Sequence, residues 1–163
     1  MDLLNFIERF QDENDCFEYF KSIREKSGII CKKCGHNKHI WLAGKVQFEC
    51  KQCGNRISIK SGTVMENSKL PIKCWFITIH ILTSSKKTFS ALEIQRYLGY
   101  PEYKSVCEML HNLHLVMDKG SNEYTFKGLL FACVNNQIPR YETTNDQQHS
   151  LHVSFSEPEN QHF

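Results

Sequence analysis

The sequence predicts an α+β fold in which a small ribbon of short antiparallel strands is flanked by helical segments. Three observations predict it. Apolar residues recur at helical spacing before residue 28 and again after residue 71. The stretch between them holds only short apolar runs of the kind that form strands. The same stretch contains two Cys-x2-Cys pairs, and a chain of 163 residues is long enough for one medium domain or two small modules.

Composition and hydropathy exclude several classes of protein. Apolar residues make up 40% and charged residues 23%, so the chain is neither globally disordered nor fibrous. The longest apolar stretch, residues 72–82, is interrupted by polar side chains and is shorter than the roughly 20 residues that span a bilayer. The first residues are acidic and lack the features of a secretory signal. We therefore expect a cytoplasmic protein with no membrane partner, whose eight cysteines stay reduced.

The first two segments are a helical lead-in, residues 1–28, and the ribbon, residues 29–66. Residues 12–15 supply capping residues between two helices of the lead-in. The apolar residues that place these helices are Leu3, Phe6, Ile7 and Phe10, then Phe17, Phe20 and Ile23. In the ribbon, strands are expected at 40–42, 46–48 and 57–59, with a turn at 43–45.

Residues 70–119 are expected to be helical. Apolar residues share one face of a helix over about 72–84. Residues 90–93 have capping-box spacing, and Gly99 stands where a helix ends in a left-handed residue. A longer helix is expected over 101–118. A short helix, a tight turn and a longer helix make this segment a helix-turn-helix candidate.

Residues 120–163 are expected to hold a remnant strand and a flexible tail. The apolar run from Leu129 to Val134 is the strand candidate. The tail from about Gln137 is rich in Asn, Gln, His, Ser and Glu, a composition typical of segments that bury no core.

The most specific motif is the repeated cysteine pair. Cys31-Lys-Lys-Cys34 and Cys50-Lys-Gln-Cys53 are separated by 15 residues, which is the spacing of a four-thiolate zinc site. A glycine follows each pair and suits the backbone of a tight knuckle. Because four protein ligands close the coordination shell, the motif predicts one structural Zn²⁺ rather than a catalytic one.

Other histidines and cysteines leave alternatives open. His36 and His39 lie close enough in sequence to replace one cysteine ligand. His111 and His114 share a helix face. They could be two ligands of a second metal site, or a polar pair that faces a groove. Three thiols beside apolar helix positions are expected to be small buried hydrophobes: Cys16, Cys74 and Cys107.

Charge is distributed unevenly along the chain. The net charge is +2, but residues 31–60 hold seven Lys or Arg against one Asp or Glu. Such a local excess attracts polyanions even when the whole protein is almost neutral. The alternative is a solvated basic face with no partner.

Several short motifs follow one another along residues 10–111. They are Phe20, Cys31-Lys-Lys-Cys34-Gly35, Cys50-Lys-Gln-Cys53-Gly54, Arg56-Ile-Ser58, Ser61-Gly62-Thr63, Leu70-Pro71 with Trp75, Tyr97-Leu98-Gly99 and Met109-Leu110-His111. With these motifs, residues 10–75 resemble the N-terminal zinc-ribbon domain of bacterial insertion-sequence transposases of the acidic-triad (DDE) class. The helices that follow are similar to the segment that joins the ribbon to the catalytic domain in that family.

The chain departs from that family after residue 125. The resemblance implies an RNase H-like catalytic domain there, opening with a strand that carries a metal-binding aspartate. Residues 127–134 contain no acid, and the 29 residues from Asn135 to Phe163 are too few for such a domain. We therefore expect no enzyme activity and interpret the chain as a truncated or stand-alone recognition part of a transposase.

The resemblance implies recognition of double-stranded DNA at transposon ends, with a full-length transposase as a second partner. Basic side chains of the ribbon would contact phosphates, which sets affinity without reading sequence. These are Lys32, Lys33, Lys38, Lys45, Lys51 and Arg56. The helical segment would approach the bases. Its candidates are Arg96, Lys104, His111 and His114.

Two other functions are compatible with the motifs. Zinc ribbons also serve as protein-interaction modules or transcription regulators, for which Trp41, Phe48 and Trp75 would be exposed anchors rather than core. Salt dependence separates this function from DNA binding, which weakens steeply as salt rises. A thiol oxidoreductase needs a reactive Cys-x2-Cys at the start of a helix, and these pairs precede expected strands.

Overall fold

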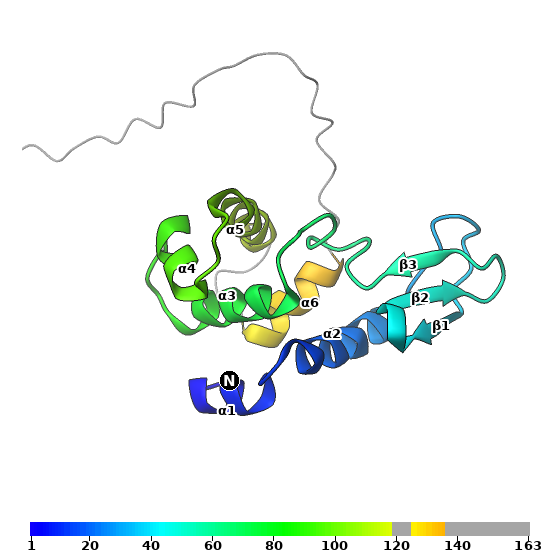
Figure 1. Ribbon diagram of the computed structural model, residues 1–163, viewed down its shortest axis with the longest axis horizontal. Coiled ribbons are helices and arrows are strands. Elements are labelled where there is room, and N and C mark those ends of the chain that lie inside the picture. Colours follow the sequence, from blue (N-terminus) through cyan, green and yellow to red (C-terminus); the bar gives the residue numbers. More distant parts are fainter. Residues whose placement is uncertain (119–124, 136–163) are drawn as a thin grey trace, which may run out of the picture.

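The computed structural model describes residues 1–118 and 125–135. The elements in these ranges are helices α1 (Leu3–Arg9) and α2 (Glu13–Ser27), strand β1 (His39–Leu42), 3₁₀ turn η1 (Ala43–Lys45), strands β2 (Gln47–Cys50) and β3 (Arg56–Ser58), and helices α3 (Ile72–Ser84), α4 (Ala91–Leu98), α5 (Tyr103–Asp118) and α6 (Phe126–Asn135). Figure 1 shows the sheet at one end of the molecule and α3, α4 and α5 at the other, with α2 between them. The α+β class is confirmed.

The helical lead-in forms as its capping residues predict. Asp2 accepts a hydrogen bond from the N–H of Asn5 at the start of α1. Asp12 and Asp15 form a reciprocal capping box at the start of α2, so two N–H groups that lack helical partners are satisfied. Gly28 ends α2 with φ at 78°, a conformation that favours glycine.

The ribbon is an antiparallel sheet in the order β1-β2-β3. Its β1–β2 connection is the 3₁₀ turn η1, closed by Val46 at φ 51°. This left-handed residue lies outside the ladder, so β2 starts at Gln47 and reaches Cys50. β3 ends at Ser58, one residue before the expected end, because the chain turns there into the loop that joins the sheet to α3.

The three helices after Pro71 follow the sequence pattern closely. α3 spans the expected residues. Ser90 and Glu93 form the expected capping box, and Gly99 ends α4 at φ 61°. α5 begins at Tyr103, two residues after Pro101. None of the described helices is both long and apolar enough to cross a membrane.

The prediction of a strand at residues 129–134 is wrong, because these residues belong to helix α6. Leu129, Leu130, Cys133 and Val134 are buried at the helical spacing i, i+1, i+4 and i+5. The helix packs against α2, α3 and α5, so a short apolar run that fits either structure is helical here. The expected tail from about Gln137 lies outside the described residues.

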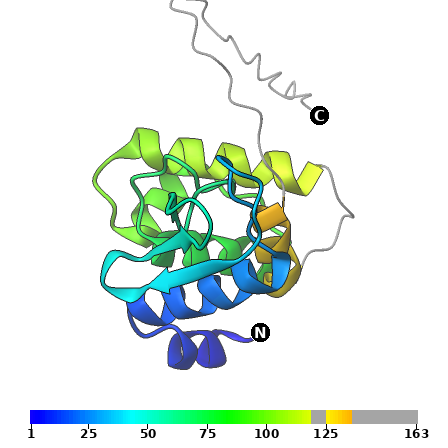
Figure 2. The ribbon, with the colours of Figure 1, turned by 90° about the vertical axis from the view of Figure 1, so that its right-hand side faces the viewer.

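One apolar core extends from the ribbon through the helices. At its helical end, Phe6, Phe10, Phe76 and Phe126 form a group of tilted and edge-to-face rings. His80 stacks on Phe6 with ring centroids 4.4 Å apart. In Figure 2, which looks at the ribbon end, α2 lies below the sheet and α5 lies on the opposite side of the molecule. The shared core fixes the ribbon relative to the helices.

Candidate metal centre

Two backbone loops of the same design carry the four ribbon cysteines. In the first, the N–H of Gly35 donates to the carbonyl of Cys31 at 2.8 Å, and the N–H of Cys31 donates to the carbonyl of His36 at 2.9 Å. In the second, Gly54 donates to Cys50 and Cys50 to Asn55, both at 2.9 Å. We call residues 31–36 the first knuckle and 50–55 the second knuckle.

Each knuckle reverses the chain at a left-handed glycine. Gly35 has φ 72° and Gly54 has φ 65°, a region that other residues rarely adopt. No atom lies within 4 Å of a Cβ built on either glycine, so backbone conformation, rather than space, requires glycine at both positions. The reversal turns both sulfurs of a pair toward the opposite knuckle.

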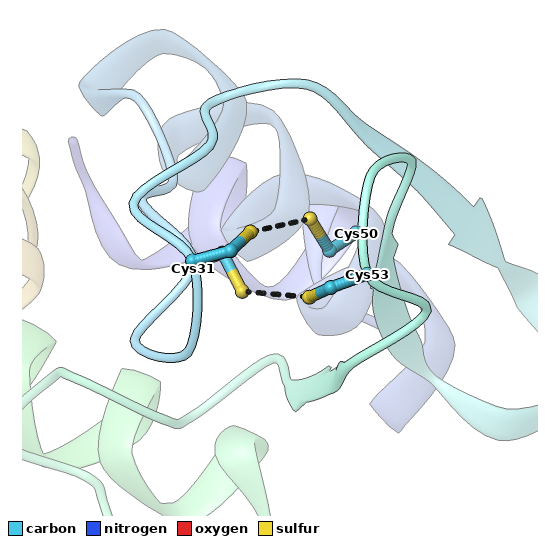
Figure 3. A group of neighbouring side chains, drawn as sticks. Cys31, Cys50 and Cys53 are labelled. Atoms are coloured by element: carbon cyan, nitrogen blue, oxygen red, sulfur yellow. Dashed lines mark hydrogen bonds between the residues drawn. The ribbon is translucent and has the colours of Figure 1, made fainter.

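The four sulfur atoms converge on one point. All lie within 4.8 Å of one another, with Cys31 Sγ 3.6 Å from Cys53 Sγ and Cys34 Sγ 3.5 Å from Cys50 Sγ. Figure 3 shows Cys31 on one loop facing Cys50 and Cys53 on the other. A tetrahedron with Zn–S bonds of about 2.3 Å has sulfurs about 3.8 Å apart, so the spacing fits one zinc ion.

The electrostatics of the cluster also fit a bound cation. Burial raises the pKa of the Cys31 thiol, but donation from the N–H groups of Cys34 and Lys33 outweighs it and lowers the pKa to about 6. At Cys34 the N–H of His36 lowers the pKa, whereas burial and the neighbouring sulfurs raise it to about 12. Because thiolates this close repel one another, a divalent cation is needed for all four to ionise. Asn55 adds an N–H···S contact of 3.8 Å to Cys31.

The alternative ligands are not part of this cluster. Among the described residues, the four cysteines are the only group of three or more His, Cys, Asp or Glu residues placed to share a metal. His39 pairs with Cys50 in the sheet, but its ring nitrogens are buried without a hydrogen-bond partner. His36 contributes its backbone carbonyl to the first knuckle. His111 and His114 belong to no such group.

Residues 11–56 match the family model of the transposase zinc-ribbon domain. That range contains both knuckles, α2, β1 and β2. This region is therefore similar to transposase zinc-ribbon domains, and its four cysteines are suited to one zinc ion.

The chain is also similar to a protein of a transposable element. A protein of Halobacterium salinarum, described as an uncharacterized protein in transposable element ISH50, is 23% identical over 111 residues. The alignment covers 66% of this chain and 38% of the relative, so the chain spans well under half of that protein's length. No solved structure matches the chain.

The basic side chains predicted on the ribbon lie at its surface. Lys33, Lys38, Lys45 and Lys51 are exposed. The other two are engaged in ion pairs, which leaves them less free for an external anion. These pairs are Lys32 with Glu66 at 3.3 Å and Arg56 with Glu49 at 3.1 Å.

The residues of the helical segment that are predicted to contact DNA lie among both basic and acidic side chains. Arg96, Lys104 and His111 are exposed, whereas His114 is half-buried. Exposed acids accompany them on and beside α5, at Glu102 and Glu108. The exposed face of α4 and α5 is therefore less basic than the ribbon.

Two cations that sequence reasoning did not single out are partly or fully withdrawn into the fold. Arg24 is 7% exposed and donates to the carbonyl of Ser61 at 2.7 Å. Lys60 is half-buried and donates to the carbonyls of Ser68 and Leu70. Helical periodicity places Arg24 on the face of Phe20, the one signal in the sequence that indicates its burial.

Proposed function

We propose that this chain is a zinc-stabilised DNA-binding module that recognises the ends of an insertion sequence, in the manner of the recognition part of a transposase. The exposed lysines around the four-cysteine cluster carry the proposal. Lys33 and Lys51 lie on the two knuckles and Lys38 lies just before β1, whereas Lys45 lies on the β1–β2 turn at the other end of the hairpin, so DNA phosphates can approach lysines along the ribbon. The match to transposase zinc-ribbon domains supports the same function.

We assign base contacts to α5 and phosphate contacts to the ribbon. Helix α5 follows a short helix and a tight turn, and Lys104 and His111 are exposed along it. Neighbouring Glu102 and Glu108 offset these charges. The ribbon therefore supplies most of the affinity and α5 a weaker contribution to sequence discrimination. A full-length transposase that binds the same ends is the proposed second partner.

The alternative function, a protein-interaction module, would need exposed aromatic anchors, and the three candidate residues do not provide them. Phe48 is 2% exposed and Trp75 is fully buried. Trp41 packs on Phe48 with ring centroids 4.7 Å apart and is covered by the ammonium of Lys21 at 5.2 Å. These aromatic side chains lie in the core or pack against it, so none of the three is an exposed anchor.

Charge reversal on the ribbon tests the DNA contact. We expect the triple variant Lys33→Glu, Lys38→Glu, Lys51→Glu to weaken binding of any duplex and to reduce the salt-dependence slope by about one per lost phosphate contact. A triple variant of exposed lysines outside the ribbon makes the same change in net charge and serves as the control: Lys69→Glu, Lys86→Glu, Lys127→Glu. Equal affinity and slope for the ribbon variant and wild type would exclude the ribbon as the electrostatic contact.

A further inference from the structure

A surface hollow of about 540 Å³ lies beside the first knuckle. It is enclosed by the end of α2, the chain leading into the first knuckle, the loop after β3 and the last turn of α6. Its volume is in the range of ligand pockets, roughly 300–1,000 Å³. Its polar lining comes from Arg24, Ser27, Lys32, Ser61 and Asn135.

Two donor atoms of residues that line this hollow lack partners. Arg24 Nε and Ser27 Oγ are buried and make no hydrogen bond. Among the described residues only His39 shares this condition, although nearly all buried polar atoms in proteins are hydrogen-bonded. Arg24 and Ser27 lie at i, i+3 on α2, so they are neighbours on one face of the helix. Two unpartnered donors at one place fit a ligand that carries several acceptor atoms.

The charge of the lining selects an anion. Arg24 and Lys32 both line the hollow, and no Asp or Glu is found among its described lining residues. The nearby carboxylate of Glu66 is engaged by Lys32 at 3.3 Å, by the hydroxyl of Ser61 at 3.3 Å and by the N–H of Gly62 at 3.0 Å. Burial lowers the pKa of Arg24, yet a guanidinium remains protonated in proteins. A buried cation with a free N–H is suited to an oxyanion.

We propose that this hollow is a phosphate-binding site that holds one backbone phosphate of bound DNA. Arg24 Nε and Ser27 Oγ, which are shielded from solvent in this structure, turn outward to donate to its oxygens, and Lys32, although paired with Glu66, adds positive charge at the rim. The assignment to DNA rests on the proposed function. It adds a DNA contact made by α2 to the contacts made by the surface lysines. The charge pattern of the ribbon does not predict this contact, because α2 lies outside the ribbon.

Placing a carboxylate in the hollow tests the DNA contact. Ser27→Glu is expected to weaken duplex binding about tenfold at moderate salt and to lower the salt slope by about one, because one charge-assisted contact is lost. Asn14→Glu adds the same charge at the exposed opposite end of α2 and is expected to leave binding within about twofold. Zinc content and the helical circular-dichroism signal show whether each variant folds.

A titration with inorganic phosphate separates this site from the proposed function. We expect phosphate to shift the ¹H–¹⁵N signal of Arg24 Nε in the wild type and not in Ser27→Glu. If phosphate shifts that signal but Ser27→Glu and Asn14→Glu bind DNA equally, the assignment to a backbone phosphate is overturned. If phosphate leaves the signal in place, the site itself is overturned. If the wild type binds no DNA while phosphate shifts the signal, the proposed function fails and the phosphate site stands.

Discussion

At the scale of single residues, Glu13 connects two distant segments. Its carboxylate accepts hydrogen bonds from the N–H groups of Ile72 at 2.6 Å and Lys73 at 2.9 Å, at the start of α3. The residue at the N-cap position of α3 is Pro71, which has no side-chain donor or acceptor, so α3 has no local side-chain cap. A carboxylate from α2 takes the place of that cap and meets the positive end of the helix dipole.

We expect Glu13→Gln to lower the free energy of unfolding by about 1–2 kcal/mol. Glutamine keeps one acceptor, but it loses the charge and directs an amide toward the second N–H. Urea denaturation measures the change. Glu18→Gln on the exposed side of α2 is the control and is expected to cost under about 0.5 kcal/mol, because Glu18 makes only a surface ion pair. Equal costs for the two variants would contradict the capping role.

Substitution of a single zinc ligand tests the four-thiolate site. We expect Cys34→Ser to reduce zinc content well below one per chain and to lower the melting temperature, because a small ribbon buries too little apolar surface to fold without its metal. Cys107→Ser changes a half-buried thiol outside the cluster and is expected to keep full zinc content. Metal analysis of both purified variants gives the answer; unchanged zinc in Cys34→Ser would exclude the four-thiolate site.

At the scale of elements, α6 joins the helices to the ribbon. The N–H of Val64, in the loop after β3, donates to the carbonyl of Cys133 at 3.1 Å. The burial of Cys133 raises the pKa of its thiol to about 12, so it behaves as an apolar group. Residues 129–134, which the sequence pattern predicts as a strand, are therefore part of the core of this protein as a helix.

The helical state of α6 can be checked by substitution. In a strand, Phe131 would share a face with the buried residues Leu129 and Cys133, whereas in the helix it is 51% exposed. We expect Phe131→Ala to cost under about 1 kcal/mol. Leu130→Ala removes a fully buried side chain and is expected to cost about 2–5 kcal/mol. Thermal or urea unfolding compares them, and a larger loss for Phe131→Ala would indicate the strand.

At the scale of the whole molecule, charge and core are organised differently. The excess positive charge lies in residues 31–60, whereas one apolar core links the ribbon with each helix that the structure describes. The ribbon's exposed lysines are thereby held in a fixed orientation relative to α5. Under the proposed function, a duplex would therefore contact both surfaces at once, because the two surfaces do not move independently.

We expect this chain to cleave or join no DNA strand when it is incubated with transposon-end duplexes and Mg²⁺ or Mn²⁺. Phosphodiester chemistry of this class uses metal ions held by several converging carboxylates, and a zinc ion with four thiolate ligands offers no position for an attacking water. Gel analysis of the duplex is the measurement. Nicked or joined products that disappear in Glu123→Ala or Asp146→Ala, two positions outside the described residues, would contradict this expectation.

Features that depend on local spacing follow from the sequence alone. The two knuckles, the capping box at Ser90 and the left-handed end at Gly99 each need only a few neighbouring residues, so their motifs predict them directly. Tertiary structure decided the features that depend on distant partners. Helix α6 forms because its apolar face packs on three other helices, and Glu13 caps a helix about 60 residues away in the chain. The hollow at Arg24 exists only where four separate segments meet, which no spacing in the sequence encodes.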